Sequence, residues 1–289
     1  MSLEYQSKLN QLLMSGKKNG LFFSDWLRKN GYSDQLIRKY RQSGWLATLD
    51  KGVMYRTGDS LSSFAALSCY NEQLNKKARV AAHSALELFG FNHYVPMGKP
   101  LLMVAHHNSN IPKWMTSDSF DKNFKPFSTK MIDVPQTSTV QIEGVDVLVS
   151  SPEQAFMECL LLAPEQYNYM DLYYVMEQLT SLRADVVQTL LENIKNQRVK
   201  RVFLYMAEKA GHYWFDMLNI DRINLGTSKQ QLVENGIYIK KYRITIPKEL
   251  NEYESYIQKT SSPFDTHYAF SLSYQGFCGS RGNRHQSVS

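Results

Sequence analysis

Apolar residues near the start of the chain recur at helical spacing. Leu9, Leu12 and Leu13 occupy positions i, i+3 and i+4, so they share one face of a helix expected over about residues 3–14. A Ser-Gly pair that ends at Gly16 interrupts the pattern, since such pairs mark turns. The chain is therefore expected to open on one amphipathic helix.

Two short helices are expected next, in the arrangement of a helix-turn-helix. Ser24 is placed to cap a helix over residues 25–30, and Ser33 to cap another over residues 34–43, because a serine side chain satisfies free N–H groups at a helix start. Gly31 lies in the short turn between them, where a helix ends. Two short helices joined by such a turn are typical of DNA-binding proteins.

A β-hairpin is expected directly after the second of these helices. Residues 45–49 and 53–57 are both rich in β-forming side chains, and the Asp-Lys-Gly sequence centred on Lys51 favours a turn between them. A hairpin in this place corresponds to the wing of a winged helix. We therefore expect residues 1–58 to form a winged helix-turn-helix domain that binds DNA.

The rest of the chain mixes helical and strand patterns. Helical spacing is found at residues 61–74, 81–89, 152–163, 170–179, 184–193 and 200–209. Strand patterns are found at residues 101–106, 127–132, 140–149 and 236–247. The two kinds do not alternate regularly, so the predicted fold class is α+β. We expect an α+β domain over residues 59–259 and a polar, flexible tail over residues 260–289.

Net charge distinguishes the predicted winged helix from the rest of the chain. The 289 residues include 33 Lys and Arg and 27 Asp and Glu, a net charge of +6. Residues 1–58 hold ten Lys and Arg against four Asp and Glu, so they carry the whole of this excess. A basic module on a neutral body indicates a polyanion as the partner of the module.

The predicted recognition helix, residues 34–43, has an apolar and a polar face. Leu36, Ile37 and Tyr40 lie within one arc of the helix and are expected to face the core. Arginine and glutamine suit base edges in a major groove, and lysine suits phosphates. The candidate DNA-binding residues lie on this helix, its cap and the wing: Ser33, Gln35, Arg38, Lys39, Arg41, Gln42, Lys51 and Arg56.

Charged residues of the body are predicted to have structural roles. Residues 76–79 are expected to form a polar break between helices, and Lys200 with Arg201 to belong to a solvated helix face. Glu153 suits the positive end of a helix dipole. Glu158 is flanked by apolar residues, so we expect it to be partly buried, with an arginine such as Arg201 as its partner.

The sequence contains no recognised catalytic or metal-binding motif. It has no P-loop, dinucleotide-binding glycine motif, zinc-protease helix or nucleophile elbow. His106 and His107 are adjacent on a predicted strand and point to opposite faces, which makes a poor metal site. The cysteines, Cys69, Cys159 and Cys278, match neither a disulfide framework nor a zinc site. We expect a cytoplasmic, non-enzymatic protein without metal, cofactor, signal peptide or membrane span.

Several segments match a known family in their order. In the winged helix they are G-Y-S at 31–33, Q-L-I-R-K-Y at 35–40, S-G-W-L at 43–46 and G-V-M-Y-R at 52–56. In the body they are S-S-P-E-Q-A-F-M-E at 150–158, K-R-V-F-L-Y-M-A-E at 200–208, N-L-G-T-S-K at 224–229 and I-K-K-Y at 239–242. Together they resemble the AbiEi family, the antitoxins of AbiE-type (type IV) toxin–antitoxin systems, which are linked to abortive phage infection.

The resemblance implies two functions. The winged helix would bind inverted repeats in double-stranded operator DNA and repress the antitoxin–toxin operon. The body would counteract a nucleotidyltransferase-like toxin encoded next to it, without the need for a stable complex between the two. No toxin-neutralising residue of this chain follows from the resemblance.

Three alternatives remain at this point. The helix-turn-helix of residues 1–58 could serve only as a platform for protein contacts. The chain could be a nuclease that its winged helix targets to DNA. It could also be a transcription factor whose body senses a ligand and which has no toxin as partner.

Overall fold

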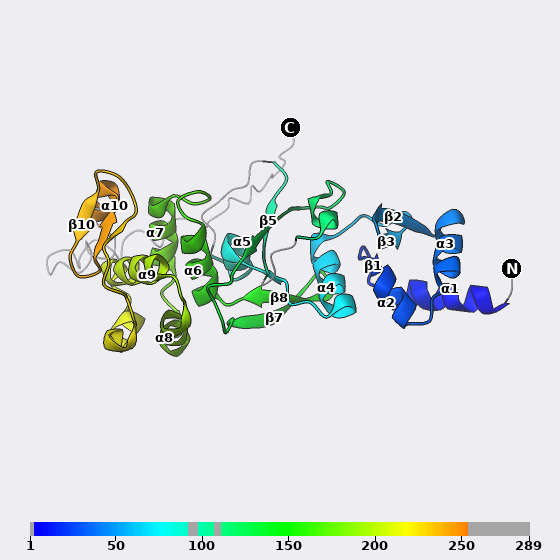
Figure 1. Cartoon of the computed structure of the whole chain (residues 1–289), viewed down its shortest axis with the longest axis horizontal. Helices are drawn as coiled ribbons and strands as arrows, with labels where there is room; N and C mark the ends of the chain where they lie inside the picture. The colour runs from blue at the N-terminus through cyan, green and yellow to red at the C-terminus, as the bar shows by residue number, and fades with distance from the viewer. Residues whose placement is uncertain (1–2, 92–97, 107–110, 254–289) are drawn as a thin grey trace, which may run out of the picture. The chain divides into compact units, whose positions relative to one another are not determined.

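The fold of the chain is mixed α+β, as the sequence predicts. The computed structural model describes residues 3–91, 98–106 and 111–253. In chain order, Figure 1 shows a winged helix in blue, a sheet in cyan to green, and a helical group in green to yellow. The contacts join Met1–Glu252 into one compact unit. No helix within the described ranges is long and apolar enough to cross a membrane, and the predicted tail lies outside those ranges.

The first part is a winged helix with one strand more than the sequence predicts. Its elements are α1 (Leu3–Ser15), β1 (Phe22–Phe23), α2 (Ser24–Lys29), α3 (Asp34–Gln42), β2 (Leu46–Asp50) and β3 (Val53–Arg56). The hairpin β2–β3 is antiparallel, as expected, and β1 pairs with β3 to give the strand order β1-β3-β2. The two residues of β1 are too few for a periodic signal, which is why the sequence does not reveal them.

The core of the winged helix confirms the predicted faces. Ile37 and Tyr40 of α3 are buried, and Leu36 is partly buried beside them. Ser33 caps α3 as expected, since its hydroxyl accepts a hydrogen bond from the Leu36 N–H at 3.2 Å. The predicted cap at Ser24 is wrong. Ser24 is the first residue of α2, and its N–H donates to the Gly52 carbonyl at 2.9 Å, which ties α2 to the wing.

A five-stranded sheet and its helices follow. The elements are α4 (Ser63–Leu74), β4 (Arg79–Val80), α5 (Ala82–Leu88), β5 (Leu101–His106), η1 (Lys113–Thr116), β6 (Asn123–Ser128), β7 (Thr137–Ile142) and β8 (Val145–Ser150). The strand order is β6-β5-β4-β8-β7. The pairs β4–β8 and β5–β6 are parallel, and the pairs β4–β5 and β7–β8 are antiparallel.

The strand predicted at residues 127–132 begins and ends earlier in the structure. It is β6, which pairs along the whole of β5, from Leu101 opposite Asn123 to His106 opposite Ser128. Pro126 lies within it, and an edge strand tolerates proline because one side of the strand needs no N–H donor. Pairing with a strand about twenty residues away, rather than local pattern, therefore sets these bounds.

Helices and a second sheet complete the described chain. They are α6 (Pro152–Leu162), α7 (Tyr169–Gln178), α8 (Ala184–Asn193), α9 (Gln197–Ala210), η2 (Tyr213–Met217), η3 (Ile220–Arg222), β9 (Gln230–Gln231), β10 (Ile237–Ile239), β11 (Ile244–Ile246) and α10 (Lys248–Glu252). The small sheet has the order β10-β11-β9. The strong start predicted for α6 is confirmed, because the Ser151 hydroxyl accepts a hydrogen bond from the Gln154 N–H.

The polar break predicted at residues 76–79 overlaps a strand in the middle of the five-stranded sheet. Arg79 belongs to β4 and is 3% exposed, and its Nη2 lies 2.7 Å from Oε1 of Glu158, which is fully buried. Arg79 also donates to Ser150 and Thr129, while the second oxygen of Glu158 accepts from the Ala82 N–H. The predicted pairing of Glu158 with Arg201 is therefore wrong, and Arg79 is the partner.

The predicted solvated face of Lys200 and Arg201 is also wrong. Both residues are buried, at 2% and 0% exposure. The Arg201 guanidinium donates to the backbone carbonyls of Leu225, Ser228 and Arg243. A helix residue thus holds the segments before and within the small sheet, because its guanidinium donates to their backbone carbonyls.

Glu153 has a specific partner in addition to its place in the first turn of α6. It is 2% exposed, and its two oxygens accept three hydrogen bonds from the side chain and backbone of Arg183 at 3.0–3.1 Å. Burial alone would raise the pKa of the Glu153 carboxyl. The hydrogen bonds from Arg183, the N–H of Glu153 itself and Ser151 outweigh burial and hold that pKa below its ordinary value.

Replacing Glu153 with glutamine is expected to lower the free energy of unfolding at pH 7 by about 1–3 kcal/mol. A carboxyl whose pKa is depressed by folding stabilises above its unfolded pKa, and this stability is lost as the pH falls through the folded pKa. The difference between Glu153→Gln and the parent chain should therefore shrink below about pH 4. Urea unfolding at pH 7, 5 and 3 tests this, and a difference that is the same at all three values would contradict it.

Candidate nucleic-acid interface

The polar face of α3 is open to solvent. All six of its candidate residues are exposed: Ser33, Gln35, Arg38, Lys39, Arg41 and Gln42. This exposure follows from the packing of the opposite face, because Ile37 and Tyr40 turn the other side of the helix into the core. The helix is therefore placed as a groove-reading helix would be, with its core side packed and its charged side exposed to solvent.

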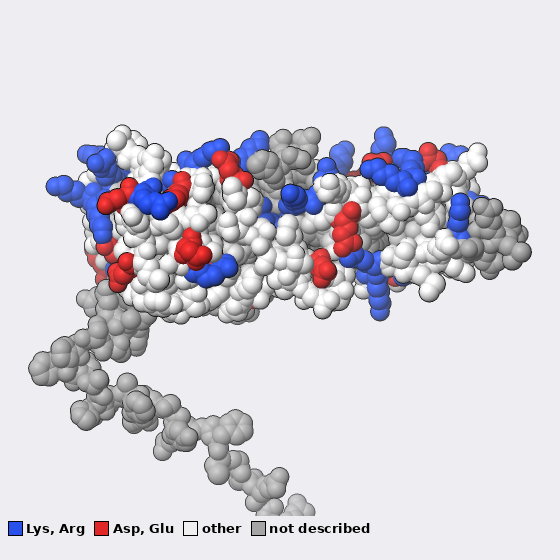
Figure 2. All heavy atoms as spheres, turned by 90° about the horizontal axis from the view of Figure 1, so that it is seen from below, with Lys and Arg blue, Asp and Glu red and all other residues white. Residues whose placement is uncertain are grey.

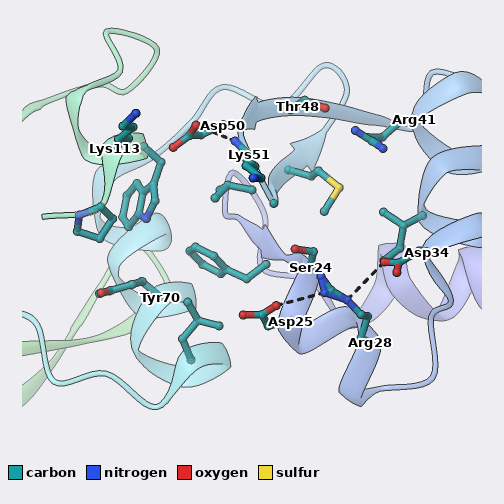
Figure 3. A pocket seen from close by; sticks show the side chains of 18 of the residues that line it. Ser24, Asp25, Arg28, Asp34, Arg41, Thr48, Asp50, Lys51, Tyr70 and Lys113 are labelled. Atoms are coloured by element: carbon teal, nitrogen blue, oxygen red, sulfur yellow. Dashed lines mark hydrogen bonds and ion pairs between the residues drawn. The ribbon is translucent and has the colours of Figure 1, made fainter. Parts of the chain in front are cut away.

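Two arginines on this face are without partners among the described residues. Arg38 and Arg41 form no hydrogen bond or ion pair there, whereas Arg28 on α2 bonds Asp25 at 3.3 Å and Asp34 at 3.4 Å. Figure 3 shows the Arg28 guanidinium between these two carboxylates and Arg41 apart from them. Arg28 is thus neutralised locally, while Arg38 and Arg41 keep their five N–H donors for an external acceptor.

The two candidate residues on the wing differ. Lys51 is exposed at the turn, where its N–H donates to the Asp50 carboxylate at 2.7 Å. Arg56 is half-buried, and its Nη2 donates to the Gly16 carbonyl at 2.5 Å. Because Arg56 is half-buried and already bonded within the domain, the proposal below rests on the other candidates.

One cleft of about 1050 Å³ adjoins the recognition helix and the wing. Arg38 and Arg41 of α3 line it together with Lys51 of the wing. Figure 3 shows Arg41 and Lys51 at this cleft. The residues of the body that line it lie at the end of α4 and around η1: Tyr70, Leu74, Lys76, Pro112, Lys113 and Trp114. The cleft is lined by six Lys and Arg and three Asp, so its lining has a positive charge excess.

Aromatic packing fixes the winged helix against the body beside this cleft. The centroid of the Phe23 ring lies 5.8 Å from that of Tyr70 and 6.0 Å from that of Trp114. The Phe23 and Tyr70 rings are tilted to each other, and the Phe23 and Trp114 rings meet edge to face. The Phe23 N–H donates to the Gln73 side chain, whose amide in turn donates to the Leu21 carbonyl. Sequence reasoning misses Lys76 and Lys113 because only this tertiary packing brings them to the recognition helix.

The other residues that the sequence singles out show no catalytic grouping. No three His, Cys, Asp or Glu side chains come together as metal ligands anywhere in the described ranges. Cys69 and Cys159 are free and buried, and burial raises the pKa of Cys69 to about 11, which disfavours a reactive thiolate. His107 and Cys278 lie outside the described residues. On the face drawn in Figure 2, positive and negative side chains of the body are interspersed.

Comparison with known proteins gives two family matches and a structural likeness. Residues 5–97 match the family described as "Transcriptional regulator, AbiEi antitoxin N-terminal domain", and residues 99–247 match "Transcriptional regulator, AbiEi antitoxin, Type IV TA system". No curated protein gives a significant match. The crystal structure of the RV2827C protein from Mycobacterium tuberculosis is similar in fold, with a TM-score of 0.56 and 12% identity over 84% of this chain and 92% of that chain.

Proposed function

This chain belongs to the family of AbiEi antitoxins, which are transcriptional regulators of type IV toxin–antitoxin systems, and we propose that it binds operator DNA and represses its own operon. The observation that carries the proposal is the open cationic surface of the winged helix. Arg38 and Arg41 are exposed on α3 without partners among the described residues, and Lys51 of the wing lines the same cleft. Such a surface suits the grooves and phosphates of double-stranded DNA.

The proposed contacts divide into base readers and phosphate contacts. Arg38, with Gln35 beside it, reads base edges in the major groove, since guanidinium and amide groups pair with guanine and adenine there. The phosphate contacts come from the remaining cations and polar groups of α3 and the wing: Ser33, Lys39, Arg41, Gln42 and Lys51. The Ser33 hydroxyl already accepts from Leu36, but its O–H stays available as a donor. Two winged helices would occupy the two arms of an inverted repeat.

The second part of the proposal concerns the toxin. We propose that the body counteracts a nucleotidyltransferase-like toxin encoded by the neighbouring gene in the cytoplasm, with no requirement for a stable complex. The family assignment and the charge-balanced body, which leaves the excess positive charge to the winged helix, support this division of labour. Co-expression of the chain with the product of the neighbouring gene tests it. Restored growth is expected, and growth arrest in the presence of the chain would contradict it.

Replacing Lys51 with alanine is expected to weaken binding to all DNA sequences about equally. A lysine on a phosphate releases a counterion without reading a base, so the slope of log K against log salt should become less steep by about 1. Fluorescence anisotropy with the chain's own upstream duplex and with a shuffled duplex measures both slopes. Lys18→Ala, which removes an exposed lysine of the same domain away from the cleft, is the matched control. A loss of affinity for the upstream duplex alone would show that Lys51 has another role.

A further inference from the structure

A carboxylate lies at the start of the recognition helix, beside the arginines that face solvent. Asp34 is the first residue of α3, and its side chain is 79% exposed. It lines the same cleft as Arg38 and Arg41. A carboxylate here repels the phosphates of DNA, so on a DNA-binding helix it needs a hydrogen-bond donor on a base to offset that repulsion.

The ion pair of Asp34 leaves half of its carboxylate open. Nε of Arg28 donates to Oδ1 of Asp34 at 3.4 Å, and Nη1 of the same guanidinium donates to Asp25 at 3.3 Å. No described residue donates a hydrogen bond to Oδ2 of Asp34. Figure 3 shows the Asp34 carboxylate beside Arg28 and apart from Arg41. The pair with Arg28 therefore orients Asp34 and leaves one oxygen for an outside donor.

Asp34 is also separate from the arginine proposed to read bases. Asp34 and Arg38 are four residues apart on α3, a spacing at which a carboxylate and a guanidinium can pair along a helix. Among the described residues Asp34 pairs with Arg28 instead. One face of the helix thus presents a free acceptor and a free donor, about 6 Å apart along the helix axis.

Cytosine is the base that matches the open oxygen. In the major groove cytosine presents its N4 amino group as a donor, whereas the N6 amino group of adenine lies beside the N7 acceptor, which repels a carboxylate. Guanine presents two acceptors there, and thymine an acceptor and a methyl group. The first residues of a recognition helix are those that contact base edges. The carboxylate of Asp34 therefore suits one of the four bases.

We infer that Asp34 is a specificity-determining residue, whose Oδ2 accepts a hydrogen bond from the N4 amino group of an operator cytosine while Arg28 positions the carboxylate. This inference rests on the proposed function, because it requires α3 to lie in the major groove. The separation of Asp34 and Arg38 corresponds to about two base steps. The cytosine therefore lies within about two base pairs of the guanine that Arg38 reads.

The two effects of Asp34 on affinity have opposite signs. On a duplex without cytosine at this position, the carboxylate faces phosphates and groove acceptors, so it only repels. On the operator, the amino group of the cytosine offsets that repulsion. Asp34 therefore contributes more to the choice of sequence than to the strength of binding.

The test uses the full chain with Asp34→Ala and, as the matched control, Asp25→Ala. Each removes one exposed carboxylate that bonds Arg28 and lines the cleft. Fluorescence anisotropy at one fixed salt concentration measures the affinities for the upstream duplex and for a shuffled one. Asp34→Ala should bind the shuffled duplex more tightly than the parent chain and lose about 5- to 150-fold of the discrimination between the two. Asp25→Ala should bind both duplexes more tightly in the same proportion.

Single base-pair replacements in the upstream duplex locate the cytosine. Each C·G pair under the footprint of the winged helix is changed in turn to T·A. One of these changes should weaken binding by the parent chain about 5- to 150-fold and leave binding by Asp34→Ala unchanged. A second variant, Asp34→Asn, should prefer A·T at that pair, because an asparagine amide pairs with N6 and N7 of adenine.

Unchanged discrimination in Asp34→Ala, with the parent chain bound to its upstream duplex, would overturn this inference and leave the proposed function intact. A role of Asp34 in helix stability, or in the pair with Arg28 alone, gives that result because neither depends on the DNA sequence. Failure of the parent chain to bind its upstream duplex would overturn both. Thermal unfolding of Asp34→Ala, expected to match the parent because the side chain is exposed, verifies that the fold is retained.

Discussion

Replacing Arg79 with methionine is expected to lower the free energy of unfolding by about 3–5 kcal/mol. The reason is the isolation of Glu158, which is 0% exposed and would remain as a buried charge without its cation. Arg79 also donates to Ser150 and Thr129, so these side chains lose a partner in the same step. Because β4 lies in the middle of the five-stranded sheet, the loss of stability should affect the whole body.

Urea unfolding of the parent chain and three variants measures this effect. Combining Arg79→Met with Glu158→Gln should recover part of the stability, since the amide is neutral and its oxygen still accepts from the Ala82 N–H. Lys195→Met breaks the exposed pair with Asp133, whose side chains are 66% and 49% exposed, and should cost about 1 kcal/mol or less. If Arg79→Met lowered the free energy of unfolding no more than Lys195→Met does, the buried pair of Arg79 and Glu158 would not stabilise the sheet as described.

Replacing Arg38 with alanine is expected to weaken binding to the upstream duplex by about 1–3 kcal/mol, or about 5- to 150-fold. The side chain is exposed on the polar face of α3, and no described residue occupies its guanidinium. A bidentate contact with a guanine would be lost, so discrimination between upstream and shuffled DNA should fall together with affinity. Lys51→Ala, by contrast, should leave that discrimination unchanged.

Titrations of both duplexes at one fixed salt concentration test Arg38, because affinities at different salt concentrations are not comparable. Lys18→Ala is again the control, since it removes one positive charge from the same domain outside the cleft. Equal affinity and equal discrimination in Arg38→Ala and the parent chain would remove α3 from the proposed interface. Loss of affinity for both duplexes in the same proportion would make Arg38 a phosphate contact.

Features set by neighbouring residues are predicted well from this sequence. The cap of Ser33 on α3, the Ser151 start of α6 and the hairpin around Lys51 each depend on residues at most a few positions apart. The burial of Ile37 and Tyr40 follows from helical spacing alone. The fold class and the exposed face of the recognition helix can therefore be predicted from the sequence alone.

Features set by distant residues were predicted wrongly or missed. Arg79 and Glu158 are 79 positions apart, and a short polar run gives no sign that its last residue enters a sheet. Arg201 binds backbone carbonyls, which have no sequence signature at all. Lys113 comes beside the wing only through the packing of Trp114 on Phe23. In each case a tertiary contact overrides what local composition suggests.

The central claim, a winged helix for DNA on a body that counteracts a toxin, is tested most directly by two readouts in the same cells. Cells carrying the neighbouring gene and a reporter under the chain's own upstream region receive either the parent chain or Arg38→Ala, at matched protein levels. The account predicts that the parent represses the reporter and restores growth, whereas Arg38→Ala restores growth but leaves the reporter active. Two results for Arg38→Ala would contradict it: full repression of the reporter, or failure both to repress the reporter and to restore growth.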